Sequence, residues 1–257
     1  ARFHWCTGDQ RAREQECCTQ PRASARGPRR RLYAPALVRR RRGSSMAPQV
    51  EGATNATKVV AQRTYQLSAA STPPPKRLAA ALELVRIAAA YGATFKSARA
   101  VLQPLCESRG ALHALLAMVA QGEPHSHVPA QALLAAATLD EGANRMMADG
   151  LGDQEAGALC ALGRTRTAET ELRIYALKVL ARAVAAPAPE GEQAAAVAGR
   201  AAASAAASAL RASMPAVVEA GAELLRALLN TKVGRAAAPG WPNAVGTAMQ
   251  EAEARGN

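Results

Sequence analysis

The chain has 257 residues, of which 49% are hydrophobic and only 3% aromatic, and alanine accounts for 65 of them. The apolar content is large enough to bury a core and excludes disorder along the whole chain, and the shortage of aromatic residues predicts helices that pack closely through small side chains. The five cysteines follow no regular spacing, which argues against a disulfide scaffold and favours a reducing compartment. No stretch reaches the roughly 18–20 apolar residues that a membrane span needs, so no span is predicted.

The net charge of +12 is concentrated in residues 1–45, which contain 12 arginines and three acidic residues, a net charge of +9. The rest of the chain holds 20 of the 32 basic groups and 17 of the 20 acidic groups, so its charges nearly balance. The leader has several prolines and no sustained hydrophobic period, and we predict disorder over residues 1–57. Its basic character is strongest in two runs, Arg29, Arg30 and Arg31, and then Arg39, Arg40, Arg41 and Arg42.

The arginine-rich leader allows three interpretations of equal weight. Arginine and serine with few acidic residues fit an organelle transit peptide, and basic runs also fit a nuclear localisation tract. In the third interpretation, Met46 is the true start and residues 1–45 are upstream sequence or an incomplete gene prediction. Contact between the arginine runs and nucleic-acid phosphates is a further, smaller alternative.

After the leader, residues 58–75 are predicted to form a short helix over 58–70 and a proline-rich linker that ends it, since Pro73, Pro74 and Pro75 cannot continue a helix. Residues 76–91 then carry two apolar stripes, which predict a helix that packs between neighbours and ends at Gly92. The same two-sided pattern predicts further helices over 129–139, 169–186 and 215–230.

These helices recur at a fixed interval. Leu134, Val179 and Leu224 are separated by two equal steps of 45 residues, and each lies inside a long apolar helix. A period of this size is typical of helical solenoids, in which each unit buries its apolar face only against the next.

The order of motifs in one stretch resembles an armadillo repeat. The stretch begins with an apolar helix from Gly110, and a polar turn with Gly122 and Pro124 follows it. A small-residue helix from Val128 to Leu139 comes next, and then the pairs Asn144-Arg145 and Asp149-Gly150. The resemblance is good over 110–163 and looser to 250, and it extends to the related HEAT class. It implies an all-α, right-handed α-solenoid of about four repeats over 76–250, followed by a tail over 251–257.

Stacked helices of this kind expose a long concave surface that suits an extended or helical segment of another protein. We therefore expect a non-enzymatic scaffold or adaptor for protein partners. The third helices of the repeats would supply the groove residues, namely His113, Leu116, Met118, Trp241 and Asn243. Trp241 and Asn243 are only two residues apart, so the peptide-binding pattern of the nuclear-import adaptors in this family does not carry over.

No motif indicates catalysis or a cofactor. His125-Ser126-His127 lies in a polar turn and offers fewer than the three or four ligands of a metal site, so we predict no metal there. Residues 150–157 are rich in glycine but have no preceding strand and no following Lys-Ser or Lys-Thr pair, which argues against a phosphate loop. Cys106 is interpreted as a buried structural thiol. An enzyme is not expected.

Two alternatives to the scaffold remain open. The leader could bind nucleic acid through its arginine runs, or the chain could be a structural subunit of a larger organellar or cytoskeletal assembly. The expected location is the cytoplasm, with the nucleus or an organelle as alternatives if the leader is a genuine targeting segment.

Overall fold

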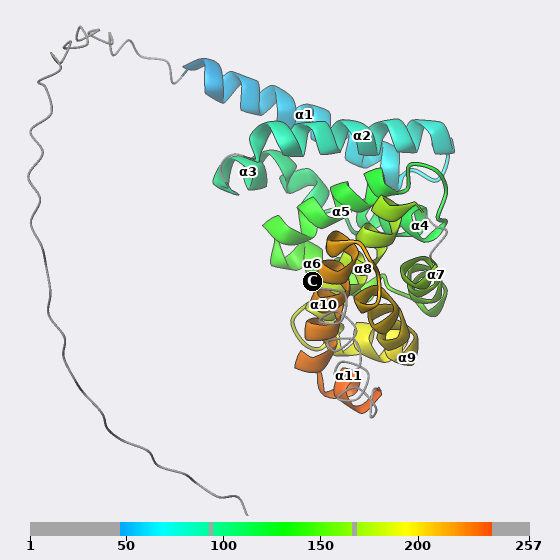
Figure 1. Cartoon of the computed structure of the whole chain (residues 1–257). Coiled ribbons are helices and arrows are strands. Elements are labelled where there is room, and N and C mark those ends of the chain that lie inside the picture. Colours follow the sequence, from blue (N-terminus) through cyan, green and yellow to red (C-terminus); the bar gives the residue numbers. More distant parts are fainter. Residues whose placement is uncertain (1–46, 93–94, 166–168, 238–257) are drawn as a thin grey trace, which may run out of the picture. The chain divides into compact units, whose positions relative to one another are not determined.

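The computed structural model describes residues 47–92, 95–165 and 169–237. This part of the chain consists of α-helices joined by short turns and contains no β-strand, which confirms the predicted all-α class (Figure 1). The described helices are α1 (Ala47–Ser68), α2 (Pro74–Tyr91), α3 (Phe95–Cys106), α4 (Arg109–Ala120), α5 (His127–Leu139), α6 (Glu141–Asp149), α7 (Asp153–Arg164), α8 (Thr170–Val184), α9 (Glu190–Leu210), α10 (Pro215–Asn230) and α11 (Lys232–Ala237).

The first two helices begin earlier than the sequence predicts. Helix α1 starts at Ala47 rather than at residue 58, and Ala53 and Ala56, expected in the leader, pack against the core. Helix α2 starts within the proline run, because a proline at the first helical positions needs no hydrogen bond from its backbone nitrogen. Pro73 is the extended N-cap, and the next two prolines form the first turn.

The described helices form two rows, and the helices of each layer contact those of the next layer in the same row. One row runs α2, α5, α8 and α10. In the other row, α1 contacts α3 and α4, and α4 contacts α6 and α7. Both α6 and α7 contact α9, and α9 contacts α11. Contacts between the rows, such as those of α4 with α5 and α7 with α8, close each layer. The fold is therefore compatible with a helical repeat.

Helices α5, α8 and α10 of the first row contact one another at a nearly constant offset in sequence. Gln131 on α5 donates a hydrogen bond to the Tyr175 hydroxyl on α8, 44 residues later, at 2.9 Å. Arg182 on α8 donates to the Ala137 carbonyl, 45 residues earlier, at 2.8 Å. Between α8 and α10, the Thr170 hydroxyl approaches the Met214 sulfur at 3.5 Å, again 44 residues apart. The contacts among α5, α8 and α10 thus lie at nearly the 45-residue step seen in the sequence.

The residues that suggested this step are not all equally buried. Val179 and Leu224 are fully buried, but Leu134 is only half-buried, and its neighbour Leu133 is the one with no exposed surface. The leucine of α5 that faces the core is therefore Leu133, one residue before the predicted Leu134.

The second row has a break in each of its middle layers. Residues 107–108 separate α3 from α4, and residues 150–152 separate α6 from α7. Helix α9 is kinked at Gly199, whose φ of 44° and ψ of −133° favour glycine. The buried face of α9 is made of small residues, as the composition predicts, and consists of Gly191, Ala194, Ala195, Ala198, Ala202, Ala205, Ala206 and Ala209. None of the described helices is long and apolar enough to cross a membrane.

Candidate functional site

Three of the predicted groove residues, His113, Leu116 and Met118, lie on α4 in the described part of the chain, and their surroundings differ. Leu116 is 1% exposed and lies in the core, because the third-helix stripe that it belongs to faces the neighbouring layers. A partner could not reach it in this fold. His113 is half-buried, and its Nε2 atom lies 3.1 Å from the Met146 carbonyl oxygen on α6. Trp241 and Asn243 lie outside the described residues, as do both arginine runs of the leader.

Met118 is the predicted residue that reaches an accessible cavity. This pocket has a volume of about 320 Å³ and lies where the start of α2, the second half of α4, the following turn and the start of α5 meet. It is lined by Pro74, Pro75, Arg77, Leu78, Ala114, Ala117, Met118, Gln121, Glu123, Pro124, Ser126 and Pro129.

The turn between α4 and α5 gives this pocket a fixed wall. Gly122 and His125 both have positive φ, at 65° and 72°. The buried Ser126 hydroxyl donates a hydrogen bond to the Met118 carbonyl at 3.1 Å, which ties the turn back to α4. Proline rings on both sides of the pocket have few conformations to lose, so binding of an apolar side chain would cost little ordering entropy.

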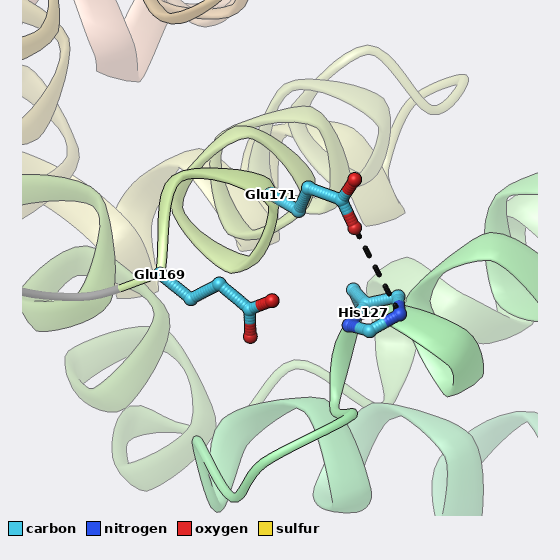
Figure 2. Close-up of side chains that lie close together, drawn as sticks. All are labelled: His127, Glu169 and Glu171. Atoms are coloured by element: carbon cyan, nitrogen blue, oxygen red, sulfur yellow. Dashed lines mark ion pairs between the residues drawn. The ribbon is translucent and has the colours of Figure 1, made fainter.

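A second group of side chains meets at the same turn. His127 is the first residue of α5, Glu169 immediately precedes α8, and Glu171 lies in the first turn of α8. Their potential ligand atoms all lie within 4.8 Å of one another. The His127 Nε2 atom is 3.8 Å from a Glu171 oxygen, and Figure 2 shows both carboxylates turned toward the imidazole.

Sequence reasoning considered the two histidines of this turn but missed the glutamates. The repeat could have indicated Glu171. This residue follows His127 by 44 residues, the same offset that separates the hydrogen-bonded residues Gln131 and Tyr175. The two ring centroids of His125 and His127 are 6.1 Å apart.

The two cysteines of the described chain, Cys106 and Cys160, are buried and form no disulfide. Burial, with a smaller contribution from the nearby Asp140 carboxylate, raises the pKa of the Cys106 thiol to about 12. Burial likewise raises the pKa of Cys160 to about 11. Because the thiolate is the nucleophile, neither residue is suited to covalent chemistry near neutral pH.

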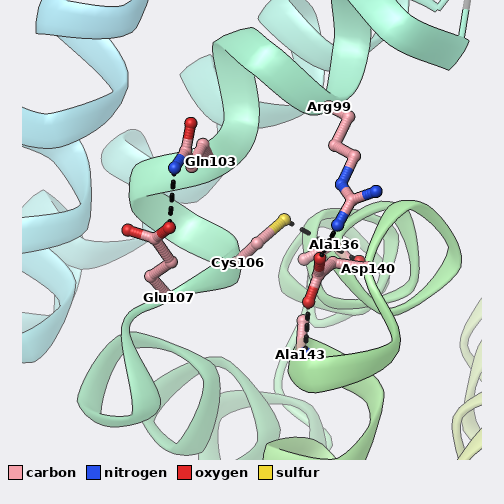
Figure 3. A network of polar contacts seen from close by, with 7 residues as sticks. All are labelled: Arg99, Gln103, Cys106, Glu107, Ala136, Asp140 and Ala143. Atoms are coloured by element: carbon pink, nitrogen blue, oxygen red, sulfur yellow. Dashed lines mark hydrogen bonds and ion pairs between the residues drawn. The ribbon is translucent and has the colours of Figure 1, made fainter.

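The surroundings of Cys106 hold helices together (Figure 3). Asp140 accepts a hydrogen bond from the Ala143 amide at 3.0 Å and so caps α6, and its other oxygen pairs with Arg99 of α3 at 2.8 Å. The Cys106 sulfur lies 3.9 Å from the Ala136 carbonyl oxygen. These contacts join α3, α5 and α6.

Comparison with protein-family models, with curated proteins and with solved structures finds no match to this chain.

Proposed function

We propose that the helical body is a right-handed armadillo-like solenoid of about four repeats that acts as a non-enzymatic scaffold for a protein partner. Two rows of helices with a 44–45-residue offset support the repeat. The break that recurs in the second row supports it too, because the layers after α1 and α2 then pair one continuous helix with one divided or kinked helix. Repeats of this kind bury their apolar faces only against neighbours and leave extended surfaces for binding.

The proline-lined pocket at α2, α4 and α5 is the observation that supports a role in binding a protein partner. Its walls are mainly apolar, with Arg77 and Glu123 among the few charged groups. The Arg77 guanidinium is already bound to the Ala69 carbonyl at 2.9 Å, so it fixes the end of α1 rather than offering an open charge. A pocket of this kind suits one apolar side chain of an extended segment.

The test compares partner capture by chains that start at Met46 and differ at one alanine. Ala117→Phe places a ring in the pocket, whereas Ala222→Phe adds the same ring on the exposed face of α10. The proposal predicts that a discrete set of partners bound by the parent chain is lost from the first variant and kept by the second. Partners retained equally by both variants, at unchanged melting temperatures, would contradict a role for the pocket.

Nucleic-acid binding through the leader is the second candidate, favoured by the net charge of +9 in residues 1–45. Each phosphate neutralised by an arginine releases a counterion, so this binding would weaken steeply as salt rises. Removal of residues 1–45 should abolish most of the affinity for RNA or DNA and flatten its salt dependence. Equal binding by the chain that starts at Met46 would eliminate this candidate.

A further inference from the structure

We propose that His127, Glu169 and Glu171 bind a zinc ion that bridges the start of α5 and the start of α8. This inference goes beyond the proposed scaffold role and rests on separate observations. One nitrogen and two carboxylates form a donor set that zinc accepts in proteins. The three residues come from two helices that contact each other in the same row.

The electrostatics of the cluster favour a cation. Ligand oxygens of the two carboxylates lie within 4.8 Å of each other, and Glu171 also pairs with the imidazole, so a cation held by both carboxylates would relieve their repulsion. Carboxylates are favourable in the first turn of a helix, which accounts for Glu171 on its own. It does not account for an imidazole between the two acids.

The His127 imidazole has a second nitrogen available to a ligand. The Nδ1 atom of His127 is buried and has no hydrogen-bond partner among the described residues. A single zinc ion would bind either this nitrogen or Nε2, because it takes one nitrogen of the ring. The His127 side chain is 18% exposed, whereas that of Glu171 is 63% exposed, so an ion can enter from the carboxylate side.

The separations suit an ion better than a direct hydrogen bond. The 3.8 Å between His127 Nε2 and the Glu171 oxygen exceeds the roughly 2.7–3.2 Å of an N–H···O bond. Ligands about 2.0–2.2 Å from a tetrahedral zinc lie about 3.4 Å from one another. The exposed glutamates reach that spacing by side-chain rotation alone, and the fourth position is left to water.

Zinc at this position would link the turn between α4 and α5 to the start of α8. Ser126, the neighbour of His127, lines the proline-rich pocket and binds the Met118 carbonyl. The ion would therefore hold one wall of the pocket as well as joining α5 to α8.

The test is a calorimetric zinc titration of the full chain in which Cys6, Cys17 and Cys18 are replaced by serine, since thiolates of the leader would compete for zinc. We expect one zinc ion per chain and a melting temperature that rises with zinc, because an ion that binds only the folded state stabilises it. Glu169→Gln and Glu171→Gln are isosteric changes at exposed positions, and each should weaken zinc binding at least about tenfold. Glu123→Gln makes the same change of charge in the nearby turn but outside the cluster, and it should leave the affinity unaltered.

Several results would overturn the assignment. One is the absence of binding at millimolar zinc, and another is an affinity that both glutamine variants retain. An equal loss on His125→Ala and on Glu171→Gln would show that the ion is bound by a ligand set that includes His125, which is not the set proposed. Magnesium binding as tight as zinc binding would indicate general attraction to acidic groups rather than a site with a nitrogen ligand.

Discussion

At the scale of single residues, the fit between layers depends on how closely backbones approach. A Cβ added at Gly221 of α10 would lie 2.5 Å from the Ala209 Cβ and 3.2 Å from the Ala206 carbonyl oxygen. Neither atom can move by side-chain rotation, so α9 and α10 would have to separate. Gly157 of α7 is exposed, and a Cβ added there meets nothing within 4 Å.

Alanine at these two positions should therefore change stability in opposite directions. Gly221→Ala should lower the free energy of unfolding by about 1–2 kcal/mol, since overpacking outweighs the gain in helix propensity. Gly157→Ala should raise it by about 0.5–1 kcal/mol, since only the propensity changes. Urea denaturation of both variants measures this, and a stabilising Gly221→Ala would refute the close packing of α9 against α10.

At the scale of elements, side-chain caps and ion pairs position the helix ends. Besides its ion pair with Arg99, Asp140 caps α6. Asp140→Ala should lower the free energy of unfolding by about 1–2 kcal/mol, and Asp140→Asn by less, because asparagine is also a good N-cap. Asp149→Asn is the matched control. It breaks only an exposed ion pair with Arg109, so chemical denaturation should detect a change below about 0.5 kcal/mol.

Helix α11 depends on a cap from the preceding layer. Both oxygens of Glu192 on α9 accept backbone hydrogen bonds, from Lys232 at 2.9 Å and from Val233 at 3.1 Å. These bonds hold the pKa of Glu192 below its usual value of 4.5. A depressed carboxyl pKa stabilises the folded form above the unfolded value, and the stabilisation is lost as pH falls through the folded value.

The docking of α11 should therefore loosen in acid, beginning below about pH 4.5. Hydrogen exchange at the Val233 amide measures this directly. We expect faster exchange in Glu192→Gln than in the parent chain at neutral pH, and a smaller difference between the two at low pH. Exchange that is equal at neutral pH would show that the cap does not hold the helix.

The sequence predicts an element well where the residues of that element alone determine its ends. The apolar stripes of α8 and α10 give those helices within two residues of their observed ends. The start of α1 is missed because Ala53 and Ala56 depend on packing rather than on a stripe. The cluster at His127 is missed for a related reason, since Glu169 and Glu171 approach it only when two layers stack.

At the scale of the whole molecule, one apolar core runs through both rows of helices. Leu224 is fully buried in α10, whereas Leu229 on the same helix is 41% exposed. Leu224→Asp should destabilise the body by more than about 4 kcal/mol, because the charge has no partner in the core. Leu229→Asp should cost less than about 1 kcal/mol. Thermal melts followed by circular dichroism compare the two, and similar melting temperatures would contradict the placement of α10.

The central claim is that α5, α8 and α10 stack in order at an offset of 44–45 residues, and cysteine cross-linking with a short reagent tests it most directly. In a chain whose five native cysteines are replaced, cysteines are introduced at Gln131 with Tyr175, at Thr170 with Met214, and at Gln131 with Met214. The first two pairs should cross-link, since their side chains are in contact, and the third should not, since it skips a layer. Efficient linkage of Gln131 to Met214, or its absence from the first two pairs in a folded chain, would contradict the stacking.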